Sequence, residues 1–253
     1  MDVSATTIYD FVQRVALPEI GPSYEAVPPP PPTFSADNQA LSIGSQLAEF
    51  SDRVPAALRA PISNNLLLAQ LAADKAASQT QDVVGWYDAY RKMLAQLGWK
   101  VRDFEMQAKD VSDKNLSVNK AIVPVITALL GPQVAAVSIV LSILNGLKDM
   151  DNASPWITLF NQSSQHSSGA KFQLSYVDAD TNGQPQITLV CLAINATRTI
   201  TQVLFFKFSA ASAQLKQGKT TLSTAIDLLE AGKAAIQQRV NDYIAANIAN
   251  IAI

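Results

Sequence analysis

Hydrophobic positions along this chain are most concentrated in residues 121–147, which read AIVPVITALLGPQVAAVSIVLSILNGL without one charged side chain. A run of 18 or more apolar residues is long enough to cross the hydrocarbon core of a bilayer as a helix. Gly131-Pro132 interrupts the run, and proline breaks or kinks a helix because it has no backbone N–H. The pattern therefore predicts two helices, residues 117–130 and 133–147, rather than one continuous helix.

Three interpretations of this helical pair stay open on the sequence. In the first, the helices are the buried core of a soluble fold. In the second, they form a sequestered hairpin that can also enter a bilayer, and a constitutive membrane span is a third interpretation. The candidate membrane-active residues share apolar side chains that recur on these helices: Ile122, Val125, Ile126, Leu129, Leu130, Val137, Ile139, Val140, Leu141 and Leu144.

From Lys171 onward the hydrophobic period becomes two, which is typical of β-strands. Two alternating segments, 172–177 and 186–195, flank a DADTNGQP sequence that predicts a hairpin loop, and a third alternating segment follows at 199–208. The middle segment is apolar on both faces, so helices must cover the sheet on both sides. A further strand with a bulge is predicted in 99–108.

Helical periodicity accounts for most of the remaining chain. It predicts a helix near 6–17, helices between 37 and 77, a helix over 83–97 and a long C-terminal helix over about 221–250. Five consecutive prolines, Pro28 to Pro32, predict a polyproline II strap between the first helix and the rest of the chain.

The whole pattern predicts an α+β fold that is mainly helical. A small antiparallel sheet of three or four strands is covered by helices on both faces, and a long helix ends the chain. The predicted organisation is an N-terminal helix with a proline-rich strap in residues 1–36, followed by a single α+β domain in 37–253 that is helical over 37–165, has a meander in 170–210 and ends in the helix of 220–251.

Composition narrows the function classes. Of the 253 residues 48% are hydrophobic and 16% charged, and the net charge of −2 provides no basic surface for nucleic acid. The single cysteine excludes an intramolecular disulfide. The first 20 residues have neither a basic region nor a continuous apolar core, so we expect no Sec signal peptide. The protein is therefore expected in the cytoplasm or on a leaderless export route.

Few side chains are candidates for chemistry. Asp178, Asp180 and Asn182 match the first half of a calcium loop, but Leu189 stands where a bidentate glutamate is required, and the same residue types also make ordinary hairpin turns. No residues with catalytic or metal-ligand spacing accompany the only histidine, His166. We therefore expect no enzyme activity, no cofactor and no resident metal.

Cys191 lies in the most apolar predicted strand. A buried cysteine there behaves as a small, unreactive hydrophobe, because an apolar environment disfavours the thiolate. The alternative is a thioester-linked acyl chain between sheet and helices, in which each buried CH₂ contributes about 0.8 kcal/mol. Cys191 is therefore the lipidation candidate.

The charge-free pair 117–147 together with the long helix 221–250 resembles the bacterial α-helical pore-forming toxins in architecture. The chain also resembles the Evf-type virulence factors, α/β proteins with an acylated cysteine, for which Cys191 is the residue that corresponds. This resemblance implies a leaderless bacterial virulence factor or toxin, a host membrane or lipid as its partner, and an oligomer on the membrane. The alternative is a non-enzymatic soluble binding or structural protein whose apolar helices are its core.

Overall fold

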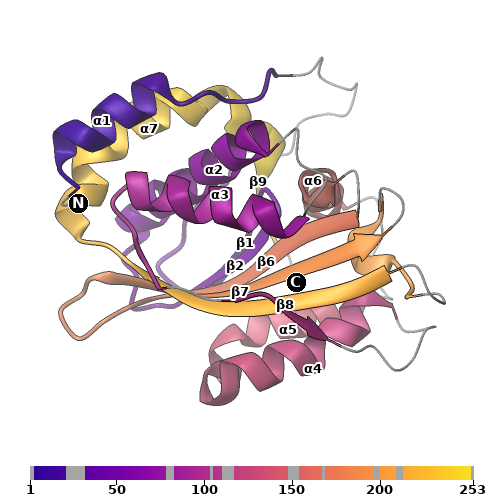
Figure 1. The fold of residues 1–253 in the computed structure, drawn as a ribbon. Coiled ribbons are helices and arrows are strands. Elements are labelled where there is room, and N and C mark those ends of the chain that lie inside the picture. The colour runs from indigo at the N-terminus through magenta and orange to yellow at the C-terminus, as the bar shows by residue number, and fades with distance from the viewer. Residues whose placement is uncertain are drawn as a thin grey trace.

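The sheet at the centre of the molecule has helices on both of its faces (Figure 1). The computed structural model describes residues 3–20, 32–77, 83–102, 105–109, 117–147, 154–166, 169–196, 200–208 and 213–251. Within these residues the strands follow the order β3 (Lys100–Val101), β8 (Ala213–Ser223), β7 (Pro185–Ala196), β6 (Gly169–Ala179), β2 (Gln46–Phe50), β1 (Gln39–Ile43) and β9 (Ile248–Asn250). Two short strands lie off this path, with β4 (Gln107–Lys109) paired to β8 and β5 (Gln165–His166) paired to β6.

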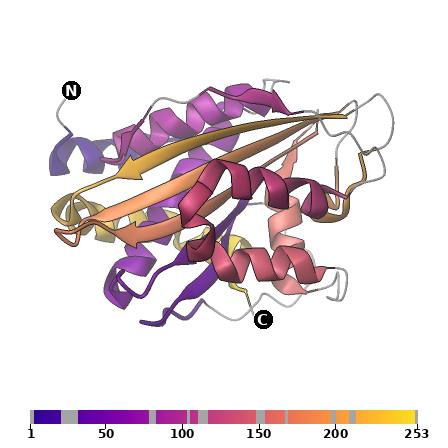
Figure 2. The same ribbon diagram turned by 90° about the horizontal axis from the view of Figure 1, so that it is seen from below.

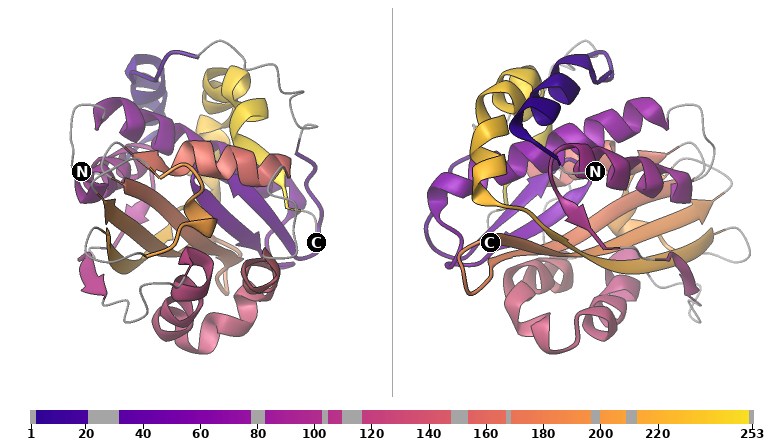
Figure 3. Two further views of the ribbon diagram at one scale, coloured as in Figure 1. Left: turned by 90° about the vertical axis from the view of Figure 1, so that its right-hand side faces the viewer. Right: turned by 60° about the vertical axis from the view of Figure 1, so that its left-hand side comes forward.

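The helices form two separate layers, which are clearest in the two views of Figure 3. One layer contains α1 (Ala5–Arg14), α2 (Ala56–Ala76), α3 (Val83–Gln96) and α7 (Ile226–Asn247). The other contains α4 (Val118–Leu130), the 3-10 helix η1 (Gly131–Val137) and α5 (Ser138–Gly146). The short helix α6 (Pro155–Ser164) packs at one end of the sheet against β1 and β9, and the 3-10 turn η3 (Val203–Phe205) contacts α4.

The sheet separates two hydrophobic clusters, and β7 contributes to both. Its Ile187, Leu189 and Cys191 pack toward α2 and α3, whereas Val190 and Leu192 pack toward α4 and α5. This is the two-faced burial predicted from the alternation in this strand. The α+β class is confirmed.

The predicted sheet size is wrong. Instead of three or four antiparallel strands, the described residues form a nine-stranded mixed sheet in which β2 and β6 pair in parallel. The additional strands β1 and β2 lie where helices were predicted. Both strands are buried on both faces, so their sequences lack the alternation of polar and apolar residues that predicts a strand. Gly44 turns the chain between them with φ +53°, and a side chain there would lie 2.6 Å from Gln70 Oε1.

The third predicted strand is also misplaced. Residues 203–205 form the turn η3, and the strand that pairs with β7 on the side away from β6 is instead β8, from Ala213 to Ser223. The C-terminal helix is correspondingly shorter than predicted, because β8 occupies its expected first turn and β9 its expected last residues.

The first helix, α1, packs against the last helix, α7. Ile8 and Val12 of α1 are buried in the cluster that contains α7, and the Tyr243 hydroxyl donates a hydrogen bond to the Pro18 carbonyl at 2.7 Å. The predicted polyproline strap falls largely outside the described residues, which omit 21–31.

Candidate functional site

The charge-free segment 121–147 lies in a hairpin, α4–η1–α5 (Val118–Gly146), whose two helices fold back on each other (Figure 2). The Asn119 side chain at the start of α4 donates a hydrogen bond to the Leu144 carbonyl near the end of α5, at 3.1 Å. Gly131 ends α4 with φ +56°, a left-handed conformation that favours glycine, and Pro132 follows at the start of η1. The predicted helix break at Gly131-Pro132 is therefore confirmed.

The inward face of this hairpin is tightly packed on the sheet. Seven of the predicted membrane-active residues are buried there: Ile122, Val125, Ile126, Leu130, Val137, Val140 and Leu144. Their cluster includes Leu47, Leu174 and Val190 from three neighbouring strands. The other three, Leu129, Ile139 and Leu141, are half-buried at its margin.

The outward face of the hairpin carries no charge from residue 121 to residue 147. Its exposed side chains are uncharged: most are small, apolar or hydroxylic, among them Pro124, Thr127, Ala128, Ala135 and Ser142, and two are the carboxamides Gln133 and Asn145. The segment Val118–Gly146 reaches a mean hydropathy of 2.0 over 18 residues, of which only 28% are buried. By contrast, the exposed face of α7 presents Asp227, Glu230 and Lys233, as expected of a helix that faces water.

Polar contacts between the sheet and the hairpin occur near its bend. The Glu49 carboxylate of β2 accepts the backbone N–H groups of Ile139 and Val140 at 3.3 and 3.0 Å. On β8, the Lys219 ammonium donates to the Leu129 carbonyl at 2.8 Å. An anion thus lies at the N-terminus of α5 and a cation at the C-terminus of α4, which is the favourable arrangement for both helix dipoles.

Glu49 is the more deeply buried of these two charges, with 2% of its surface exposed. Burial raises the pKa of its carboxyl above the ordinary value, while the hydrogen bonds from Val140 and Ile139 act in the opposite direction. Neither Glu49 nor Lys219 was predicted as a site residue. The only sequence signal for Glu49 was a single charge inside the apolar segment QLAEF.

Cys191 lies on the face of β7 opposite to the hairpin, beneath α2 and α3. It is fully buried, and burial raises the pKa of its thiol far above the ordinary value. Lipidation of Cys191 stays a prediction, and an acyl chain on this sulfur would lie in the α2–α3 layer rather than under α4 and α5.

We expect Cys191 of the native protein to resist alkylation by iodoacetamide, because the thiolate is the reactive form and neither solvent nor reagent reaches it. The unfolded chain should react fully. Intact mass before and after denaturation measures both states, and rapid alkylation of the native protein would contradict the burial. The same spectrum tests acylation, since the mass of the bare chain is incompatible with a thioester.

The calcium-loop candidates are occupied by other interactions. Asp178 accepts a hydrogen bond from Ser51 and forms an ion pair with Arg53. The Asp180 carboxylate accepts the backbone N–H groups of Asn182 and Gln184 and thereby shapes the turn between β6 and β7. No group of three or more potential metal ligands occurs among the described residues. The geometry is that of a hairpin turn.

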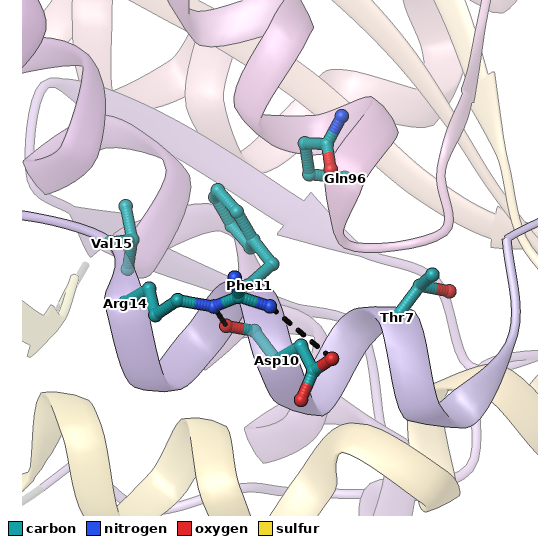
Figure 4. A pocket seen from close by; sticks show the side chains of 6 residues that line it. All are labelled: Thr7, Asp10, Phe11, Arg14, Val15 and Gln96. Atoms are coloured by element: carbon teal, nitrogen blue, oxygen red, sulfur yellow. Dashed lines mark hydrogen bonds and ion pairs between the residues drawn. The ribbon is translucent and has the colours of Figure 1, made fainter.

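A groove of about 440 Å³ lies between α1 and the end of α3 (Figure 4). Phe11 and Val15 line its apolar part, while Asp10 and Arg14 form an exposed ion pair at its rim. The groove contains no buried polar group directed at a ligand, and both charges at its rim are paired with each other.

No protein-family model and no curated protein matches the sequence. Among solved structures, one described as a delta-endotoxin has 12% identity, covers 85% of this chain and 96% of that chain, and has a TM-score of 0.36. The activated Cyt2Ba monomer from Bacillus thuringiensis subsp. israelensis has 14% identity, covers 71% and 97%, and has a TM-score of 0.35. The Evf virulence factor has 12% identity, covers 98% and 91%, and has a TM-score of 0.31. These values indicate a weak structural resemblance.

Proposed function

We propose that this chain is a non-enzymatic toxin or virulence protein that acts on a lipid membrane, and that the α4–η1–α5 hairpin is the segment that enters the bilayer. The observation that carries the proposal is the outward face of the hairpin, which carries no charge after Lys120 in the first turn of α4. A helix that only covers a soluble core gains solubility from charges on its outer face, and α7 of the same chain has them.

The energetics of transfer support this proposal. Lipid tails are as apolar as leucine, so contacts with lipid replace the contacts that the buried residues of the hairpin make with the sheet. Lys120 lies at the end of the hairpin, and the rest of the outward face adds no charged group, each of which would cost about 2.5–3.5 kcal/mol near a helix centre. Backbone groups stay satisfied inside the helices, as a bilayer requires.

The dimensions favour entry with the bend first. The 13 residues of α4 rise about 20 Å, which is less than the roughly 30 Å hydrocarbon core. Gly131 and Pro132 at the bend are exposed and uncharged. A folded hairpin therefore penetrates part of the bilayer, and spanning it requires the two helices to align.

Site-directed fluorescence tests this proposal. In a Cys191→Ala background, Ala128→Cys and Ala135→Cys place an environment-sensitive nitrobenzoxadiazole label on the exposed face of the hairpin. With anionic or zwitterionic vesicles, we expect the emission of both labels to shift to the blue and to be quenched by spin-labelled lipid tails, because both sites enter hydrocarbon.

The matched control is Ala95→Cys, at an alanine that is also exposed but lies on α3 in the opposite helical layer. Its label should remain in water and unquenched. Dye release from the same vesicles then reports whether insertion also permeabilises the bilayer. If the hairpin labels behave like the Ala95 label with every lipid composition tested, membrane entry is excluded.

The alternative, a soluble binding or structural protein, is favoured by the burial of the inward face. Ile122, Ile126 and Leu144 are completely buried against the sheet. Limited proteolysis distinguishes the two proposals, because a permanent core resists cleavage with and without vesicles. A membrane-active hairpin changes its protection when lipid is added.

A further inference from the structure

Among the described residues, the side chains of the sheet that form hydrogen bonds with the hairpin all reach its bend or the helix ends beside the bend. The Lys219 ammonium of β8 donates to the Leu129 carbonyl at 2.8 Å, at the end of α4. The Glu49 carboxyl of β2 accepts the N–H groups of Ile139 and Val140 at 3.3 and 3.0 Å, in the first turn of α5. Two different strands thus hold the two helix ends that meet at the bend.

The bend η1 lies across the sheet between these two contacts. Its Gln133 carboxamide accepts a hydrogen bond from the Thr188 hydroxyl of β7 at 3.4 Å, and η1 also contacts β6. Strands β8, β7, β6 and β2 are consecutive in the sheet, so Lys219 and Glu49 lie three strand spacings apart, about 14 Å across the sheet. The seven residues of η1 also rise by about 14 Å as a 3-10 helix. The length of the bend therefore matches the separation of the two side chains that hold its ends.

The opposite end of the hairpin is attached differently. Val118 begins α4 and donates its N–H group to the Phe206 carbonyl at 2.8 Å, so a backbone hydrogen bond holds this end. Asn119 joins the two helices to each other there, through the Leu144 carbonyl. The bend is therefore the end of the hairpin that can lift away from the sheet, and it lifts only when the contacts of Glu49 and Lys219 break.

These hydrogen bonds differ from the apolar contacts of the hairpin in what can replace them. Lipid tails replace apolar contacts, but they offer no hydrogen-bond partner. The N–H groups in the first turn of a helix and the carbonyls in its last turn have no partner within that helix. The contacts of Glu49 and Lys219 are therefore the part of the attachment that hydrocarbon does not replace. A carboxyl group keeps an acceptor in either protonation state, so this part requires no particular charge on Glu49.

We propose that Glu49 and Lys219 form a clamp that holds the bend of the α4–η1–α5 hairpin on the sheet and limits how often the hairpin lifts away. Both are positioning residues, because they act through the helix ends and not through contact with lipid. The clamp rests on the proposed membrane function for its use, since it sets the rate at which the hairpin enters a bilayer. Its effect on the hairpin is a property of the soluble protein.

Amide hydrogen exchange of the soluble protein tests the clamp without any lipid. Glu49→Ala leaves the N–H groups of Ile139 and Val140 covered but without an acceptor, so we expect the hairpin amides to exchange about ten- to a hundredfold faster. Lys219→Met keeps an apolar stem, removes the donor to Leu129 and should accelerate exchange several-fold. Each variant should accelerate exchange in both α4 and α5, because the bend lifts as one unit. Exchange in β7 and α7 should stay as in the wild type.

The matched control is Lys216→Met, the same substitution on the same strand. Lys216 pairs with Ala193, which belongs to the cluster under α2 and α3, so it lies on the opposite face and its loss should leave the hairpin unchanged. Glu49→Gln keeps one carbonyl acceptor and should fall between the wild type and Glu49→Ala; if Glu49→Ala does not fold, Glu49→Gln and Lys219→Met still decide the matter. Acceleration confined to the helix that each residue contacts would mean local fraying, and equal acceleration in β7 and α7 would mean general loss of stability. Either result overturns the clamp.

Insertion into vesicles of mixed phosphatidylcholine and phosphatidylglycerol completes the test, followed by the label at Ala128→Cys in the Cys191→Ala background. We expect the insertion rate to rise in Glu49→Ala and Lys219→Met by about the factors found in exchange, and to stay at the wild-type value in Lys216→Met. Equal insertion rates in all of these proteins overturn the clamp's control of entry and leave the membrane function intact. Faster exchange of the hairpin without insertion of any variant refutes the membrane function and retains the clamp.

Discussion

Ser142→Asp is expected to weaken membrane insertion roughly 100-fold while leaving the soluble fold intact. Ser142 is exposed near the middle of α5. Exposed substitutions of this kind usually change the free energy of unfolding by less than about 0.5 kcal/mol. An aspartate near the centre of a helix in a bilayer costs about 2.5–3.5 kcal/mol, which corresponds to a loss of roughly two orders of magnitude in partitioning.

Partitioning into vesicles, measured by sedimentation, and thermal unfolding in solution together check this expectation. Ala95→Asp places the same charge on the exposed surface of α3 and should leave both quantities unchanged. Ser142→Leu should strengthen partitioning, since it adds apolar surface without charge. Partitioning of Ser142→Asp equal to that of the wild type would show that α5 never contacts the hydrocarbon core.

Arg59→Ala is expected to lower the free energy of unfolding by about 3–5 kcal/mol, a large part of the roughly 5–15 kcal/mol that stabilises a domain. Arg59 of α2 has no exposed surface, and its guanidinium lies 5.7 Å from the centre of the Phe50 ring. It donates hydrogen bonds to four backbone carbonyls, those of Ala36, Asp37, Ser51 and Val54. Truncation leaves these carbonyls without their donor.

Urea unfolding measures this loss. Arg59→Lys should recover part of it, because an ammonium donates up to three hydrogen bonds but cannot reproduce the planar geometry of the guanidinium. Arg14→Ala is the control, since Arg14 is an exposed arginine in an i,i+4 ion pair with Asp10 and should cost less than about 0.5 kcal/mol. Equal stability of Arg59→Ala and Arg14→Ala would contradict the role assigned to Arg59.

Elements that depend on the backbone preferences of a few neighbouring residues could be predicted from the sequence alone. Proline restricts its own backbone and that of the preceding residue, so the helix break at Gly131-Pro132 could be read directly from the chain. The strands β6 and β7 could be predicted because their turn carries Asp, Asn and Gly, whose backbone preferences are equally local. The absence of charge from 121 to 147 likewise needed no structure.

Only the tertiary structure decided the rest of the sheet and the attachment of the hairpin. Strands β1 and β2 are buried on both faces, which removes the period-two pattern, and β9 exists because the last residues pair with β1. The polar segment of β8 is a strand because it pairs with β7 along its full length. Glu49 and the start of α5 are 90 residues apart in sequence, so no local preference brings a carboxylate to that helix end. Their contact depends on the order of strands in the sheet and on which of its faces the hairpin covers.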